Sequence, residues 1–489
     1  MNIVTATTEV SPIAKTGGLG DMVSFLSKEW VKQGHNAIIV LPKYKHIDTN
    51  KLGFQNLKRT LIVQMGYWTE FAGVWEGKLP GTEVKVYLVE NNNYFNREGI
   101  YGDPNEFSDN DRRFIFFDKA VFEVCRAINF KPDILHAHDF HTGFSMSFLK
   151  EFYRQDPLFS KTAGVYTIHN LAHQGKFNPY TSLLYAGIPF NQFTPYSPYE
   201  YFGTVNAMKV GISYADKITT VSPNYSHEIM LPYYGEGLDG ILKQHSADFM
   251  GILNGIDDTE WHPGRDKLIY KNFDKNYLEG KKENKLALLR DFGLNEGDDL
   301  DMPLISIITR LAEQKGVDLI TDKMEELLSQ NNFRFLVLAS GDYKYEKYFE
   351  YLHHRFPRRV QIHIGYDNNL AHKIYAGSDF FLMPSRFEPC GLAQMFSLKY
   401  GTIPIVRETG GLADTVLEYD YHKQIGTGFT FWQYNSEDMA YAVKRALGIF
   451  NKQPHWDKIR QNAMEQNFSS EKTAQDYIQA FYWALEKVK

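Results

Sequence analysis

Residues 15–21 read KTGGLGD, and nearly the same letters return at residues 407–415 as RETGGLADT. Glycine lets a loop turn tightly and lets its amide N–H groups approach an anion at the start of a helix. A turn that only starts a helix would account for one copy. Two copies at equivalent places favour the same ligand-binding glycine loop occurring twice, once in each of two similar domains.

Short β-branched runs extend outward from both loops. The first series begins near residues 2, 36, 133, 164 and 217, and the second near residues 304, 334, 360, 379 and 403. Helical patterns lie between the runs; after the first loop, Met22, Val23, Leu26 and Trp30 share one face. This alternation predicts an α/β fold of two Rossmann-like domains with parallel sheets, in which ligands bind beyond the carboxyl ends of the strands.

The 489 residues suit two domains of about 250 residues each. We expect an N-terminal domain over residues 1–251, a C-terminal domain over 252–468, and a C-terminal helix over 469–489 that packs back onto the N-terminal domain. The turn-rich segment 252–264 is the expected hinge, and the polar segment 271–285 is expected at the surface. From Glu471 on, apolar residues recur at helical spacing, which indicates an amphipathic helix.

Composition excludes several classes of protein. The formal net charge is −6 with both signs interspersed, so no nucleic-acid-binding patch is visible. No apolar run approaches the roughly 20 residues that cross a bilayer, and the first residues show no targeting region. Two cysteines are too few for a disulfide framework. These features predict a cytoplasmic protein without nucleic-acid or membrane partners.

Three cations follow strands at the expected ligand edge. Arg310 and Lys315 come after the strand near residue 304, and Lys15 precedes the first glycine loop. Arginine binds phosphate oxygens as a fork and lysine as a point charge, so these residues suit a diphosphate. For Arg310 and Lys315, the alternative interpretation is a surface ion pair with Glu313.

Two further stretches carry candidate chemistry. Glu388 lies between Phe387 and Pro389, a poor place for a merely solvated carboxylate, although a helix-anchoring role also fits. The stretch HAHDFH, residues 136–141, suggests a metal, but its spacing fits substrate hydrogen bonding better than zinc ligation. We therefore expect no metal.

Taken in order, KTGGLGD, HAHDFHTG, YTIHNLAHQG, ILNGID, TRLAEQKG, PSRFEPCGL and RETGGLADTV resemble the motifs of bacterial glycogen synthases and plant starch synthases. The resemblance runs from Met1 to about Phe468 and includes NREGIYG at residues 96–102. It implies a GT-B fold, in which two Rossmann-like domains with parallel sheets face a deep interdomain cleft. It also implies retaining transfer of glucose from ADP-glucose to the 4-hydroxyl at the non-reducing end of an α-1,4-glucan.

The resemblance further implies the roles of individual residues. Those implied in catalysis are Glu388, Lys15, Arg310, Lys315, His169 and Asp139. Those implied in binding the donor are Lys15, Gly17, Gly18, Asn254, Arg310, Lys315, Tyr366, Glu388, Cys390, Gly391, Leu392, Thr409, Gly410, Gly411 and Leu412. Glu9, Asp139 and His141 would contact the acceptor glucan, Tyr366 would stack on adenine, and no cofactor is implied beyond the donor itself.

Many retaining GT-B enzymes carry a second glutamate eight positions after the first, where this chain has Phe396. The glycogen and starch synthase group resembles this chain in lacking it. Two alternatives stay open: a UDP-glucose-dependent glucosyltransferase, and a catalytically silent glucan-binding paralogue. A dinucleotide oxidoreductase is disfavoured, since the first loop lacks G-x-G-x-x-G.

Overall fold

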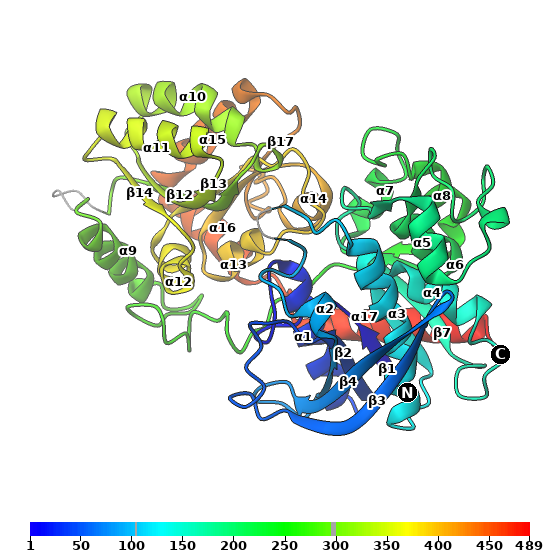
Figure 1. Cartoon of the computed structure of the whole chain (residues 1–489). Coiled ribbons are helices and arrows are strands. Elements are labelled where there is room, and N and C mark those ends of the chain that lie inside the picture. Colours follow the sequence, from blue (N-terminus) through cyan, green and yellow to red (C-terminus); the bar gives the residue numbers. More distant parts are fainter. Residues whose placement is uncertain (103–104, 295–299) are drawn as a thin grey trace. The chain divides into compact units, whose positions relative to one another are not determined.

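The computed structural model describes residues 1–102, 105–294 and 300–489. The chain forms two compact units, one of Met1–Gly255 with Ser470–Lys489 and one of Ile256–Ser469 (Figure 1). Each unit is built on its own largely parallel sheet. The predicted α/β class with two Rossmann-like domains is therefore confirmed.

The sheet of the first unit has the strand order β11-β10-β7-β6-β1-β2-β5-β4-β3. Its strands are β1 (Asn2–Ala6), β2 (Asn36–Pro42), β3 (Gln55–Met65), β4 (Trp68–Lys78), β5 (Lys85–Glu90), β6 (Ile134–His138), β7 (Ala163–Ile168), β10 (Lys217–Thr220) and β11 (Phe249–Gly251). All pairings from β11 to β5 are parallel, in agreement with the first predicted series.

The last two strands of this sheet, β3 and β4, pair antiparallel, so the expectation of a purely parallel sheet is wrong at this edge. In β3, buried Leu61, Val63 and Met65 alternate with exposed neighbours such as Ile62. A strand with one face in water alternates in hydrophobicity, whereas a strand covered on both faces reads as a continuous apolar run. A search for continuous runs therefore misses β3 and β4.

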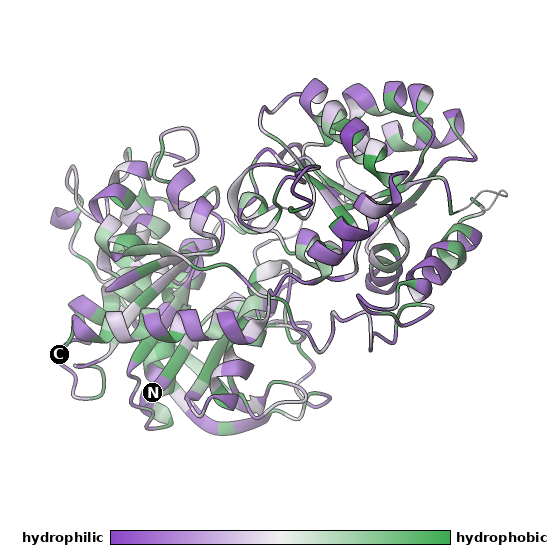
Figure 2. Ribbon diagram, turned by 180° about the vertical axis from the view of Figure 1, so that it is seen from behind, coloured by the Kyte–Doolittle hydropathy of each residue, from purple (hydrophilic) through white to green (hydrophobic). Residues whose placement is uncertain are grey.

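Helices cover this sheet. They are α1 (Gly18–Lys32), α2 (Asn92–Phe95), α3 (Asn110–Ala127), α4 (Gly143–Glu151), α5 (Pro179–Ala186), α6 (Ala207–Tyr214), α7 (Pro223–Glu228), α8 (Asp239–Gln244) and α17 (Ser470–Glu486). The four residues predicted to share a face of α1 are all buried. Helix α17 packs on α1, where Trp30 Nε1 donates to the Ala474 carbonyl oxygen at 3.2 Å. Its outward residues are largely hydrophilic (Figure 2). Tyr482 in this helix is half exposed.

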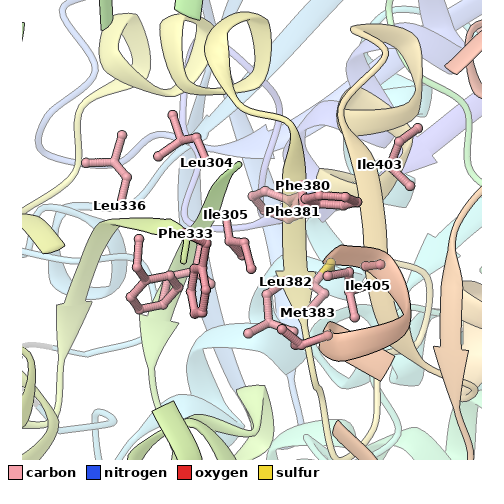
Figure 3. Close-up of a cluster of buried hydrophobic side chains, with 14 of the residues drawn as sticks. Leu304, Ile305, Phe333, Leu336, Phe380, Phe381, Leu382, Met383, Ile403 and Ile405 are labelled. Atoms are coloured by element: carbon pink, nitrogen blue, oxygen red, sulfur yellow. The ribbon is translucent and has the colours of Figure 1, made fainter. Parts of the chain in front are cut away.

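The second unit has a six-stranded parallel sheet in the order β14-β13-β12-β15-β16-β17. Its strands are β12 (Leu304–Leu311), β13 (Arg334–Gly341), β14 (Val360–Ile364), β15 (Phe380–Met383), β16 (Ile403–Arg407) and β17 (Phe429–Phe431). Its helices are α9 (Glu279–Asp291), α10 (Val317–Gln330), α11 (Tyr343–Arg355), α12 (Asn368–Gly377), α13 (Ala393–Lys399), α14 (Gly410–Thr415), α15 (Ser436–Phe450) and α16 (Gln453–Met464). Side chains of β12, β13, β15 and β16 form the core (Figure 3).

The segment 271–285, expected at the surface, is partly buried because it leads into α9. Lys281 is 4% exposed, and its Nζ donates to Thr402 Oγ1 at 2.7 Å and to the Ala376 carbonyl oxygen at 3.1 Å. Burial lowers the pKa of Lys281 well below its usual value. Lys285 forms a buried ion pair of 2.7 Å with Asp379. A lysine-rich stretch looks solvated in sequence, because the acceptors that allow its burial lie in segments far along the chain.

Candidate active site

Glu9 organises the loop that follows β1. Its carboxylate is 3% exposed and accepts hydrogen bonds from the amides of Thr16 and Gly17 at 2.6 and 2.9 Å. It also accepts from Thr16 Oγ1 at 2.7 Å and from the Tyr101 hydroxyl at 2.5 Å. Both carboxylate oxygens are engaged, so Glu9, expected to contact the acceptor, shapes the first glycine loop from within the protein.

The remaining residues of this loop face water. Gly17 is exposed, and a Cβ placed there would meet no atom within 4 Å. Gly18 is the exposed first residue of α1. Lys15 is 38% exposed in its side chain and forms a 2.7 Å ion pair with Asp21. The loop therefore presents one cation and the start of a helix to solvent. The Gly17 amide already donates to Glu9, so binding of an anion by that amide would require this hydrogen bond to exchange.

Asp139 follows β6 in a strained backbone conformation. Its φ of 54° and ψ of −175° lie in a region that non-glycine residues rarely adopt. Oδ1 accepts the His169 amide at 2.7 Å, and the Asp139 amide donates to the Thr167 carbonyl oxygen at 2.9 Å. Burial raises the pKa of Asp139 to about 7, with hydrogen bonds from His169 and Asn170 opposing that rise. The carboxyl group therefore exchanges protons near neutral pH.

The histidines of HAHDFH have three different surroundings. His138 Nδ1 lies 3.1 Å from His169 Nε2, so one ring donates to the other. His141 stacks on Tyr101, with ring centroids 4.3 Å apart. His136 lies in the core against Trp30. Burial lowers the pKa of His138 well below its usual value and that of His169 to about 3, so both rings are neutral at physiological pH.

In the described part of the chain, no three His, Cys, Asp or Glu side chains gather in the way that a metal ion requires. Asn254 is 6% exposed. Its Oδ1 is buried and has no hydrogen-bond partner among the residues that the structure describes. A buried amide oxygen without a partner is costly, so Asn254 is available to a ligand group.

In the second unit, two loops at the carboxyl ends of β12 and β15 bring Lys315 to Glu388. Gly316 has a φ of 69°, and a Cβ there would lie 2.0 Å from the Pro384 carbonyl oxygen, so only glycine permits this approach. Lys315 Nζ then lies 2.6 Å from Glu388 Oε2, which also accepts from Ser385 Oγ at 3.1 Å. Glu388 is 6% exposed, which makes the pair a largely desolvated one.

Arg310 is exposed at the end of β12, and its guanidinium has no ion-pair or hydrogen-bond partner among the described residues. Glu313, the partner considered from the sequence, instead pairs with Arg386 at 2.7 Å. Arg310 thus offers an unneutralised cation near the Lys315 loop, as binding of an anionic ligand requires.

The second glycine loop packs against the Glu388 loop. A Cβ on Gly410, whose φ is 45°, would lie 1.9 Å from the Glu388 carbonyl oxygen. A Cβ on Gly411 would lie 2.2 Å from the Cys390 carbonyl oxygen, and the Gly411 amide donates to the Glu388 carbonyl oxygen at 3.1 Å. The two TGGL copies therefore differ: the first presents exposed backbone, and the second locks the loop that carries Glu388. Binding of phosphate by the Gly411 amide would require that hydrogen bond to exchange.

The other predicted donor residues lie around these loops. Cys390 is 5% exposed, and Gly391, with a φ of 71°, precedes Leu392, the N-cap of α13. Thr409 and Leu412 are fully buried, and the Leu412 amide donates to the Thr409 carbonyl oxygen at 3.0 Å. Tyr366, just past β14, is 83% exposed, which leaves its ring free to stack on a planar group.

Sequence reasoning considered His138 within HAHDFH, as a metal or substrate contact, and did not single out Tyr101, Ser385 or Gly316 as contributors to the site. All four lie inside stretches that it quoted, NREGIYG, HAHDFH, PSRFEPCGL and TRLAEQKG. Their roles are contacts to other site residues, and a single sequence carries no signal for such contacts.

The family described as "Starch synthase catalytic domain" matches residues 2–244, and "Glycosyl transferases group 1" matches residues 295–466. A glycogen synthase of Thermotoga maritima is 43% identical over 493 residues, which cover 100% of both chains. A glycogen synthase of Bacillus cereus (strain Q1) is 41% identical over 488 residues, which cover 99% of this chain and 100% of the relative.

Solved structures agree in fold. The catalytic domain of starch synthase IV from Arabidopsis thaliana, bound to ADP and acarbose, matches with a TM-score of 0.90 and 33% identity over 99% of each chain. Sucrose-phosphate synthase from Thermosynechococcus elongatus matches with a TM-score of 0.60 and 14% identity, which shows the fold alone. Two Rossmann-like units with these loops define the class as a GT-B glycosyltransferase. Within that class, the chain belongs to the glycogen and starch synthase family. No helix in the described residues is long and apolar enough to span a membrane.

Proposed function

We propose that this enzyme transfers glucose from ADP-glucose to the non-reducing 4-hydroxyl of an α-1,4-glucan, with retention of configuration. The similarity to glycogen synthases over the whole chain supports this function, as does the ADP and acarbose in the Arabidopsis starch synthase structure. The observation that carries it is the largely desolvated Lys315–Glu388 pair, with the unneutralised Arg310 on the same strand end as Lys315, because it places two cations and one carboxylate at the neighbouring carboxyl ends of β12 and β15.

On the donor side, Arg310 and Lys315 neutralise the diphosphate. Negative charge grows on the β-phosphate as the bond to the glucose C1 breaks, and cations already in place stabilise that charge most strongly where water is excluded. Glu388 accepts a glucose hydroxyl and stabilises the oxocarbenium-like transition state. Tyr366 stacks on adenine, and Lys15 with the loop at Gly17 and Gly18 adds a further anion contact once the Gly17 amide exchanges its hydrogen bond to Glu9.

On the acceptor side, Asp139 and His169 hydrogen-bond the glucan. Because His169 is neutral, it orients hydroxyl groups without adding charge. The candidate carboxylates are Glu388, which holds a glucose hydroxyl, and Asp139, which contacts the glucan, so neither is assigned as a nucleophile. The acceptor oxygen therefore attacks C1 from the face that ADP leaves, and its proton passes to the departing phosphate, which leaves as ADP.

No cofactor is required in this proposal, because protein cations take the place of a metal at the diphosphate. The test is release of ADP from ADP-glucose, measured with and without glycogen and with UDP-glucose as competitor. Glycogen-dependent release of ADP supports the proposal. Release only of UDP from UDP-glucose would establish the other donor, and absence of any release would favour a silent glucan-binding protein.

A further inference from the structure

Phe202 occupies a turn position that its side chain does not suit. The amide and carbonyl groups of Tyr201 and Thr204 exchange hydrogen bonds of 2.8 and 2.9 Å, which leaves Phe202 and Gly203 as a two-residue hairpin loop. Both central residues have positive φ, 47° and 81°. Turns of this kind favour Asn-Gly or Asp-Gly, since a bulky residue is strained at the first position.

Tyr196 repeats the anomaly six residues earlier. The Ser197 amide donates to the Thr194 carbonyl oxygen at 3.0 Å, so Pro195 and Tyr196 are the central residues of a turn. Tyr196 has a φ of 68° at the position where a type II turn favours glycine. Lys209 Nζ holds both turns by donating to the carbonyl oxygens of Ser197 and Glu200 at 2.8 and 2.6 Å.

Burial does not compensate for either strained conformation. Tyr196 is 98% exposed and Phe202 is 86% exposed. The β3–β4 turn of the same unit shows the usual solution: Gly66 takes the positive φ of 62°, and exposed Tyr67 has an ordinary φ. Phe202 packs edge-on against Tyr201, with ring centroids 4.9 Å apart, and still leaves most of its ring in water. Strained residues that persist without burial point to a function, and two exposed rings point to a ligand that stacks on them.

The surroundings of the rings favour a carbohydrate. Polar side chains that can hydrogen-bond hydroxyl groups, Gln192, Thr194 and Glu200, lie in the same segment. An apolar protein interface would need a contiguous apolar patch, whereas a sugar offers an apolar C–H face for the ring and hydroxyl groups for the polar rim.

The turn is also continuous with the acceptor-side residues. Lys176 Nζ lies 5.3 Å from the Tyr201 ring centroid, and strand β8 (Lys176–Phe177) pairs with β9 (Val205–Asn206), which follows the turn. The ring centroids of Phe177 and Phe140 are 6.1 Å apart, and those of Phe140 and His141 are 3.7 Å apart. A chain of contacts thus joins Phe202 to the segment that carries Asp139.

We propose that Tyr196 and Phe202 form an aromatic platform that binds the glucan at glucose units beyond those that react. The inference rests on the proposed function, because it takes its ligand from the acceptor named there. The platform adds affinity for long or branched chains and leaves the chemical step unchanged.

The test uses the full chain with Tyr196→Gly and Phe202→Asn combined, since these residues suit the turns and the variant should fold. Relief of strain should raise its Tm by about 2–4 °C or leave it unchanged. Retardation in native gels that contain glycogen should weaken about five- to tenfold, as loss of aromatic contacts predicts. Transfer from ADP-glucose to maltotriose should keep its kcat and KM within about twofold. Tyr67→Asn is the matched control and should change neither binding nor transfer.

Equal retardation of the double variant and the parent protein would overturn the platform, and so would an equal loss of maltotriose transfer, which would place the rings in the reaction itself. If the parent protein transfers no glucose from ADP-glucose, the proposed function fails, and the gel comparison still decides whether the two rings bind glucan.

Discussion

Lys315 Nζ lies 2.6 Å from Glu388 Oε2 although 73 residues separate the two in sequence. Each side chain satisfies the other in a site that is largely closed to water. A charged group left alone in such a site is costly, so the loss of one partner disturbs the other. Lys315 therefore both positions Glu388 and serves as one of the cations proposed to meet the diphosphate.

Glu388→Ala should lower turnover about 10²–10³-fold with little change in secondary structure, because it removes one contact to the transition state. Steady-state ADP release and circular dichroism measure the two effects. The control is Glu313→Ala, which removes an exposed carboxylate from a neighbouring ion pair and should leave turnover within about twofold. A folded Glu388→Ala protein with normal turnover would refute the role.

Arg310→Ala should slow single-turnover transfer strongly while glucan affinity stays nearly constant. The guanidinium has no partner among the described residues that its removal could destabilise, so the free energy of unfolding should not change. Rapid-quench kinetics and glycogen binding separate the two effects. Collapse of glycogen affinity with unchanged chemistry would contradict the assignment; Arg355→Ala, a change in an exposed pair with Glu325, is the control.

Asp139→Asn should alter the pH dependence of stability. A carboxyl group whose pKa rises to about 7 on folding binds a proton more tightly in the folded state, so folding stability falls as pH rises from about 4 to 7. The asparagine variant lacks this loss and keeps an oxygen for the His169 amide. We compare the free energy of unfolding of the variant with that of the parent at each pH. The difference in favour of the variant should grow by on the order of 2–4 kcal/mol from pH 4 to pH 8. Urea unfolding at both pH values is the measurement, and parallel curves would show that Asp139 ionises normally.

The two TGGL loops should differ in how alanine affects their stability. Gly411→Ala places a Cβ against the Cys390 backbone and should displace the Glu388 loop, which lowers both the Tm and turnover. Gly17→Ala meets no protein atom and has an ordinary extended φ, so its Tm should be unchanged. If a substrate approaches the Gly17 backbone as proposed, turnover should still fall. Normal turnover in a stable Gly17→Ala protein would remove this loop from the donor site.

Activity should survive EDTA. Arg310 and Lys315 are proposed to supply the positive charge that metal-dependent transferases take from a bound cation. ADP release measured with and without chelator checks this, with added Mn²⁺ or Zn²⁺ as the control. If EDTA abolishes activity and added Mn²⁺ or Zn²⁺ restores it, the prediction is wrong, and HAHDFH becomes the candidate metal site.

The amino-acid sequence by itself determined the alternation of strands and helices, because runs buried on both faces must be apolar. It also identified the loops that carry the candidate site, since glycine pairs and isolated cations at the ends of such runs are typical of anion-binding loops. The strands near residues 2, 36, 304 and 403 and the apolar face of α1 follow directly from local pattern. The family resemblance rests on the same short stretches.

Only the tertiary structure decided which of these residues meet. The approach of Lys315 to Glu388 depends on Gly316 passing within contact of Pro384, and the burial of Lys281 depends on acceptors from distant elements. The strain at Asp139 and Phe202 is likewise invisible in sequence, because both residue types adopt ordinary backbone conformations elsewhere. Contacts between distant segments set these properties, whereas local pattern sets the elements that bring the segments together.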